Sequence, residues 1–354
     1  MHRSLFSVLA LFSLGSAATH PTVTPIRAGC VDLRLPIRAS ATNFDLDVTP
    51  ARRTERITGT FLMQFVFCEP TVRNASRADT LLVLSPGSTY NTMYWDMPFQ
   101  PETYSFVRRA SVSGFATLNV ARLGDGKSEH PADPEIVQLP LQSALLVELV
   151  RLARTGTLVP GKRFRTVVGI GHSLSSGMLN DVILTAPDVL DGVVLSGYAH
   201  VSNGQPLAVI PGFFPARTIL PARFGGLADG YLTSDNITTR SGFYGPAGTF
   251  DPAVLQFDEG HKDLVTVAEL ASFGIDEVPA PDFKGPVLAV NGNFDRSFCP
   301  APLCANLLDE PTFYPKAKSV ETTVIQGSGH DLNLHLTAPV FFQTILDWLD
   351  RNGF

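Results

Sequence analysis

The stretch that decides the fold of this chain is Val167-Val168-Gly169-Ile170-Gly171-His172-Ser173-Leu174-Ser175-Ser176-Gly177. Its apolar first half ends at Gly171, and the small residues that follow open a segment with helical periodicity. The pattern predicts a buried strand, a sharp turn with Ser173 at its apex, and a helix. Because such a turn strains the apical residue, the positions two before and two after it must be small. Gly171 meets this fully, and Ser175 less well than glycine. On its own the pentapeptide is also compatible with an ordinary strand-to-helix turn.

Continuous apolar runs on both sides of this stretch predict further buried strands, as in a parallel sheet covered on both faces. With the stretch itself, the runs are residues 81–84, 116–120, 166–170, 192–195, 286–290 and 320–325. Segments with a period of 3.6 residues predict helices at residues 104–112, 140–153, 174–186 and 340–352. Strands that alternate with helices predict an α/β fold with a mostly parallel central sheet and helices on both faces.

Two regions depart from this rhythm. Residues 31–37, 44–48 and 57–67 alternate apolar and polar side chains, which predicts antiparallel strands at one edge of the sheet. Residues 198–283 are rich in Gly, Pro and Phe, with one helical patch near residues 263–273. Because a structureless loop of that length is improbable, we interpret residues 198–283 as a cap over the carboxyl edge of the sheet, inserted between core residues 19–197 and 284–354. A surface insertion without a functional role is the alternative.

The N-terminus has the three parts of a secretory signal peptide. Met1-His2-Arg3 is basic, residues 5–14 are apolar, and the small residues 15–18 suit cleavage, so we expect residues 1–18 to be removed. The apolar run is about half of the roughly 20 residues that span a bilayer, so we expect a secreted protein without stable membrane insertion. The formal charge of the 354 residues is −6 and no run of Lys or Arg occurs, which argues against nucleic acid as a partner.

Four cysteines in a secreted chain predict two disulfides. Three pairings are possible, and we favour Cys30 with Cys68 and Cys299 with Cys304 because each pair is local. A zinc site is the weaker alternative, because no Cys-x-x-Cys spacing occurs. The sequons at Asn74 and Asn236 predict glycosylation of surface positions.

Three polar residues follow predicted strands in an order that suits nucleophilic catalysis. Ser173 follows one strand, Asp295 lies on a loop beyond residues 286–290, and His330 follows residues 320–325. A serine hydroxyl needs a base to take its proton, and the base needs an acid that orients it. The order Ser, Asp, His is the one expected on such a sheet, so we predict Ser173 as nucleophile, His330 as base and Asp295 as its partner.

An acyl-transfer site also needs backbone N–H donors for the oxyanion. Leu174 supplies one, as the residue after the nucleophile. The second donor is expected from the loop Ser85-Pro86-Gly87-Ser88-Thr89-Tyr90, with Ser88 as first choice and Thr89 as second.

These motifs resemble those of the α/β-hydrolase superfamily, and more closely those of secreted α/β hydrolases of filamentous fungi. The resemblance covers nearly all of the chain after the leader and rests on Gly59-Thr60-Phe61, Phe67-Cys68-Glu69-Pro70, Tyr94-Trp95-Asp96, Arg122-Leu123-Gly124-Asp125-Gly126-Lys127-Ser128, the Ser173 turn, Asp191-Gly192-Val193-Val194-Leu195-Ser196-Gly197 and Gly329-His330. Two positions depart from the family pattern: Pro86 replaces the usual histidine of a His-Gly pair, and Ser175 replaces glycine. The resemblance implies activity on esters, lactones or lipids.

The sequence therefore predicts a secreted serine hydrolase that cleaves a carboxylic ester or lactone through an acyl-enzyme and needs no cofactor or metal. Aromatic residues of the expected cap favour a hydrophobic, uncharged small molecule as substrate. They are Phe213, Phe214, Phe224, Phe243, Tyr244, Phe250 and Phe257. A binding protein of the same fold, a fold member that catalyses a non-hydrolytic reaction, and a peptidase are the alternatives. The oligomeric state is left open.

Overall fold

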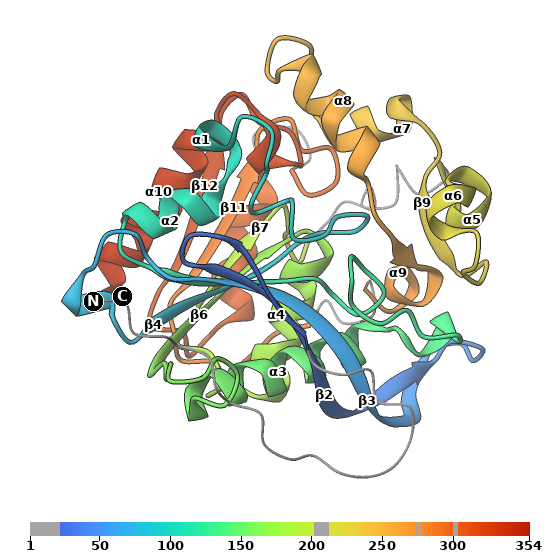
Figure 1. Cartoon of the computed structure of the whole chain (residues 1–354), viewed down its shortest axis with the longest axis horizontal. Coiled ribbons are helices and arrows are strands. Elements are labelled where there is room, and N and C mark those ends of the chain that lie inside the picture. The colour runs from blue at the N-terminus through green and yellow to red at the C-terminus, as the bar shows by residue number, and fades with distance from the viewer. Residues whose placement is uncertain (1–21, 202–211, 274, 276–277, 300–303) are drawn as a thin grey trace.

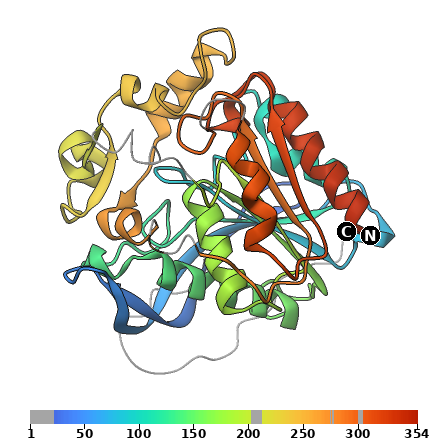
Figure 2. The ribbon, with the colours of Figure 1, turned by 180° about the vertical axis from the view of Figure 1, so that it is seen from behind.

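The computed structural model describes residues 22–354 except 202–211, 274, 276–277 and 300–303. The predicted signal peptide, residues 1–18, lies outside the described residues. Figures 1 and 2 show the two sides of a central sheet with helices packed on both faces and a smaller group of elements at one edge.

The described strands of the central sheet correspond to the predicted apolar and alternating runs. They are β1 (Thr22–Arg27), β2 (Cys30–Asp45), β3 (Arg52–Cys68), β4 (Thr80–Ser85), β5 (Ala116–Val120), β6 (Thr166–His172), β7 (Gly192–Ser196), β11 (Val287–Gly292) and β12 (Val320–Ile325). Their order is β1-β2-β3-β5-β4-β6-β7-β11-β12, and all neighbours from β5 to β12 are parallel. The prediction of a mostly parallel sheet is confirmed.

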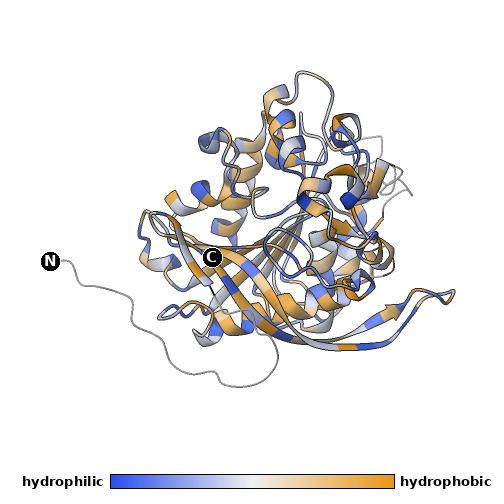
Figure 3. Cartoon of the chain, turned by 45° about the vertical axis from the view of Figure 1, so that its right-hand side comes forward, coloured by the Kyte–Doolittle hydropathy of each residue, from blue (hydrophilic) through white to orange (hydrophobic). Residues whose placement is uncertain are grey.

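The antiparallel edge of the sheet is formed by β1, β2 and β3. The separate strand expected at residues 44–48 is wrong: β2 continues without a break to Asp45, and residues 46–50 form the turn to β3. A one-residue shift in the pairing with β3 between Asn43 and Phe44 accounts for the broken alternation that suggested two strands. The far ends of β2 and β3 pair with each other and form an arm that extends from the body of the molecule (Figure 3).

Helices cover the sheet on both faces. Those on one face are α3 (Leu139–Thr155) and α4 (Leu174–Thr185), and those on the other are α1 (Pro101–Tyr104), α2 (Phe106–Val112) and α10 (Ala338–Asn352). The single helix predicted at residues 104–112 is divided in the structure: α1 ends at Tyr104 and α2 begins at Phe106. The break occurs because Ser105 has an extended backbone, and its hydroxyl accepts the N–H of Arg108 as the N-cap of α2. Short 3-10 helices occur at Ala75–Arg77, Pro134–Ile136, Ala305–Phe313 and Leu332–Leu334.

Residues 212–273 form a second, smaller unit at the carboxyl end of the sheet, which we call the cap. Its described elements are β8 (Phe213–Pro215), α5 (Ala216–Ile219), α6 (Pro221–Phe224), β9 (Tyr231–Ser234), α7 (Ile237–Ser241), α8 (Pro252–His261), β10 (Val265–Thr266) and α9 (Val267–Phe273). The three strands make an antiparallel sheet in the order β10-β9-β8. Figure 1 shows these elements to one side of the central sheet, above α3 and α4.

The structure contains both favoured disulfides, Cys30–Cys68 across β2 and β3 and Cys299–Cys304 in the loop after β11. In the described part of the chain, no helix has the length and apolar character needed to cross a membrane. Asn236 is exposed and Asn74 is half-buried, and each caps a short helix through its side-chain oxygen. Glycosylation of these two residues remains a prediction.

Candidate active site

The turn between β6 and α4 holds Ser173 in a strained conformation, with φ 53° and ψ −121°. Few residues other than glycine adopt a positive φ without local support. The Ser173 N–H donates to the carbonyl of Ser196 on β7 at 2.8 Å. A Cβ atom at Gly171 would lie 2.6 Å from the carbonyl oxygen of Ser175, so only glycine fits at that position. The turn therefore has the predicted form.

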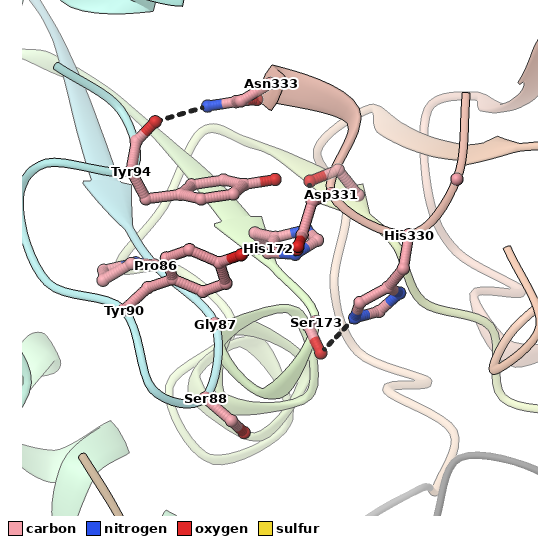
Figure 4. Close-up of polar contacts among 12 residues, drawn as sticks. Pro86, Gly87, Ser88, Tyr90, Tyr94, His172, Ser173, His330, Asp331 and Asn333 are labelled. Carbon is pink, nitrogen blue, oxygen red and sulfur yellow. Dashed lines mark hydrogen bonds and ion pairs between the residues drawn. The ribbon is translucent and has the colours of Figure 1, made fainter. Parts of the chain in front are cut away.

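Asp295 and His330 meet Ser173 at the carboxyl edge of the sheet. His330 Nε2 lies 2.9 Å from Ser173 Oγ, and His330 Nδ1 lies 2.9 Å from Asp295 Oδ2. Figure 4 shows the imidazole of His330 directed at the Ser173 hydroxyl. Asp295 is fully buried, and its other oxygen accepts the N–H groups of Ser297 and Phe298 at 2.8 and 3.0 Å. The three predicted residues thus form one hydrogen-bonded chain.

Asp295 and His330 each stabilise the charged form of the other. Burial alone raises the pKa of the Asp295 carboxyl, but the neighbouring His330 and the two backbone donors outweigh burial and lower it. Burial alone lowers the pKa of His330, but the charge and hydrogen bond of Asp295 raise it above its ordinary value of 6.5. Asp331 acts in the same direction on His330. The arrangement favours an ionised aspartate beside an imidazole that is ready to accept a proton.

Two backbone N–H groups near Ser173 are available as oxyanion donors. Among the residues that the structure describes, neither the N–H of Ser88 nor that of Leu174 has a hydrogen-bond acceptor. The Thr89 N–H donates to the carbonyl of Leu264 at 2.9 Å, which rules out the second choice made from the sequence. A Cβ atom at Gly87 would lie 3.1 Å from the Cβ of Ser173, so the loop packs directly against the nucleophile.

The two positions that depart from the family pattern contact each other. Ser175 Oγ donates to the carbonyl of Pro86 at 2.5 Å and lies 2.9 Å from Ser85 Oγ. Arg122, which is fully buried, donates from Nη1 to the carbonyls of Pro86 and Gly87, each at 2.6 Å. Because a trans peptide is planar with its C=O and N–H antiparallel, the bond to the Gly87 carbonyl fixes the direction of the Ser88 N–H.

A pocket opens beside Ser173, with a cavity volume of about 40 Å³. That is space for about three water molecules. Its walls are mostly apolar, and its lining residues include Leu174, Phe213, Phe243, Leu270, Phe273 and Phe298. Of the seven cap aromatics singled out from the sequence, Phe213 and Phe243 line the pocket, while Phe214 is exposed.

Sequence reasoning missed three polar residues that line this pocket: Tyr90, His172 and Asp331. Residues 90 and 331 carry no periodic signal, but each lies within two positions of a predicted site residue.

Ligand-type atoms of His172, His330 and Asp331 lie within 4.8 Å of one another. These atoms already bond to each other or to Ser173 and Asp295, so a metal ion there would compete with that chain.

Comparisons with known proteins identify the family and the fold. The model of the alpha/beta hydrolase family matches residues 82–342. A soluble variant of monoglyceride lipase from Saccharomyces cerevisiae has a similar structure, with a TM-score of 0.59, 13% identity, and coverage of 82% of this chain and 92% of that chain.

Two further structures have similar folds. The monoacylglycerol lipase of Paleococcus ferrophilus has a TM-score of 0.56 and 15% identity, and the match covers 81% of this chain and 98% of that one. A thermophilic esterase from Thermogutta terrifontis has a TM-score of 0.54 and 16% identity, with 90% and 99% covered. No curated protein matches the sequence. At these identities the structures establish the fold, and the family model, which spans most of the chain, shows that the chain belongs to the alpha/beta hydrolase family.

Proposed function

We propose that this protein is a secreted serine hydrolase that cleaves carboxylic esters or lactones of small hydrophobic molecules. The observation that carries the proposal is the hydrogen-bonded series Ser173–His330–Asp295, with both bonds at 2.9 Å. Beside it lie the N–H groups of Ser88 and Leu174, which have no acceptor among the described residues. Lipases and esterases among the similar structures are consistent with ester chemistry. The two disulfides are consistent with an extracellular protein.

In the proposed mechanism Ser173 Oγ attacks the carbonyl carbon while His330 Nε2 takes the hydroxyl proton. Asp295 holds the imidazole in the required tautomer and stabilises its protonated form. The N–H groups of Ser88 and Leu174 bind the oxyanion of the tetrahedral intermediate. His330 then returns the proton to the leaving alkoxide, and a water molecule activated by His330 hydrolyses the acyl-enzyme.

The pocket gives the proposal a substrate class. A ring-lined cavity of about 40 Å³ suits a short acyl group better than a long chain. The lining residues that the structure describes include no Lys or Arg. The ionisable groups among them, Tyr90, His172, His330 and Asp331, are bonded to protein partners. We therefore expect short, uncharged esters and small lactones to be preferred over charged peptides.

The proposal is tested with a fluorophosphonate probe and a panel of p-nitrophenyl esters of increasing chain length, together with a small lactone and a cationic peptide ester. We expect the wild type to be labelled at Ser173 and to turn over the short esters fastest. Ser173→Ala should abolish labelling and lower turnover at least about a thousandfold while the far-UV circular dichroism stays unchanged. A folded Ser173→Ala variant with near-native turnover would remove Ser173 from the mechanism.

The panel also separates the alternative functions. A peptidase would cleave the cationic peptide substrate faster than every apolar ester. A binding protein or a non-hydrolytic enzyme of this fold would show neither labelling nor ester turnover.

A further inference from the structure

Three buried polar residues each stand next to a proposed catalytic group in the sequence. They are Thr89 after Ser88, His172 before Ser173, and Asp331 after His330. Thr89, His172 and Asp331 are all fully buried. Three further buried residues join them, Tyr90 from the oxyanion loop and Arg240 and Asp258 from the cap, and we call these six residues the buried lattice.

Arg240 and Asp258 anchor the lattice in the cap. Arg240 Nε and Nη2 bond to the two oxygens of Asp258 at 2.8 and 2.6 Å. The remaining nitrogen, Nη1, donates to the hydroxyl of Thr89 at 2.5 Å. The Thr89 carbonyl accepts the N–H of Asp263 at 2.7 Å, so the cap holds both the side chain and the backbone of Thr89.

Tyr90 connects this anchor to the catalytic loops. Its hydroxyl lies 2.5 Å from Asp331 Oδ2 and 3.0 Å from Asp258 Oδ2, and its ring lies under the Arg240 guanidinium at 3.9 Å. The other oxygen of Asp331 lies 3.2 Å from His172 Nε2. Figure 4 shows Tyr90, His172 and Asp331 grouped beside the Ser173–His330 pair.

Two physical arguments distinguish this lattice from ordinary packing. Thr89 has φ 62°, which is strained for a β-branched residue and persists only where the surroundings enforce it. Buried ion pairs such as Arg240–Asp258 contribute little net stability over apolar side chains of similar size, because desolvation offsets most of the attraction. The buried lattice thus holds a strained loop through polar interactions, although apolar side chains of similar size would stabilise the fold about as well.

We propose that Tyr90, Arg240 and Asp258 are positioning residues that keep Ser88, Ser173 and His330 in register. They bind Thr89 and Asp331 directly, and they reach His172 through Asp331. The cap is then part of the catalytic machinery and not only a wall of the pocket. This inference rests on the proposed function.

Tyr90→Phe removes the central hydroxyl and keeps the ring under Arg240. Its matched control is Tyr231→Phe, because Tyr231 is a buried cap tyrosine whose hydroxyl bonds only to the Pro131 carbonyl at 2.8 Å among the described residues. We expect Tyr90→Phe to lower kcat for p-nitrophenyl acetate by about tenfold or more, because small misplacements of catalytic groups are costly. KM should stay within about twofold, and Tyr231→Phe should retain wild-type kcat.

A second pair tests the oxyanion side. Thr89→Val removes the hydroxyl that accepts from Arg240, with little change in shape, and should lower kcat. Thr89→Ser keeps the hydroxyl and should therefore keep kcat near that of the wild type. Thr233→Val is the control, because Thr233 is a fully buried cap residue whose hydroxyl bonds to the Asp263 carbonyl at 2.8 Å.

The outcomes separate the two proposals. If the wild type is labelled by fluorophosphonate but Tyr90→Phe and Thr89→Val match their controls in kcat, the lattice has no positioning role. The same conclusion follows if each variant and its control lose kcat and thermal stability equally. A wild type that is neither labelled nor active would overturn the proposed function, and the lattice proposal with it.

Discussion

The central sheet and the cap contribute to the same site in different ways. Ser173, Asp295 and His330 all follow strands of the central sheet, whose parallel strands β4, β5, β6, β7, β11 and β12 each have five to seven residues. The cap strands have only two to four residues, and the cap supplies aromatic side chains to the pocket lining and buried polar contacts. Backbone geometry of the central sheet thus places the three proposed catalytic residues, whereas the contacts proposed to hold their surroundings come from side chains of a separate unit.

The largest effect should come from Asp295, the core residue proposed to orient the base. We expect Asp295→Asn to lower kcat by about 10³–10⁴-fold, because the imidazole loses its tautomer control and the partner of its positive charge. If an equally large loss follows substitution of a cap residue such as Phe243, the division of roles between the two units is wrong.

Asp295→Asn should also change the pH dependence of kcat/KM. Burial lowers the pKa of His330, but Asp295 raises it above 6.5, and His330 must be neutral to act as base. In the wild type, kcat/KM should therefore fall as the pH drops through a value above 6.5. Without the charge of Asp295, burial dominates, and the acid limb of Asp295→Asn should move to lower pH in a profile measured with p-nitrophenyl acetate.

A smaller effect is expected where the core supports its own oxyanion loop. Ser175→Ala removes the bond to the Pro86 carbonyl and should lower kcat by about tenfold, the order of one lost hydrogen bond at the site. The control is Ser143→Ala, because buried Ser143 on α3 bonds to the Met178 carbonyl at 3.2 Å, away from the loop. Equal kcat values for the two variants would show that the bond from Ser175 to the Pro86 carbonyl is not needed to position the loop.

The smallest effect should come from the cap wall. Phe243→Leu enlarges the pocket beside His330, whose ring lies 5.7 Å from that of Phe243. We expect the ratio of kcat/KM for butyrate to that for acetate to rise about fivefold, below the tenfold or more that one methylene group is worth in a tight hydrophobic pocket. Phe224→Leu, a buried cap substitution away from the pocket, should leave the ratio unchanged. If Phe243→Leu changes the rate of fluorophosphonate labelling but not the ratio of kcat/KM for butyrate to that for acetate, Phe243 does not set the preferred chain length.

The sequence by itself determined the parts that depend on local geometry. The apolar runs located the strands, and because parallel strands end at one edge, the residues that follow them had to meet there. Gly171 marked the sharp turn at Ser173, since any side chain at that position collides with the backbone of Ser175. The two disulfides followed from nearness along the chain.

Only the tertiary structure decided what supports these residues. The bonds from Tyr90 to Asp258 and Asp331 and from Arg240 to Thr89 join residues 151 to 241 positions apart, and such contacts leave no periodic trace in the sequence. The two departures, Pro86 and Ser175, looked unrelated in the sequence, but they are hydrogen-bonded to each other. Local patterns report backbone geometry, whereas the partner of a buried polar group depends on which distant segments the folded chain brings within about 3 Å.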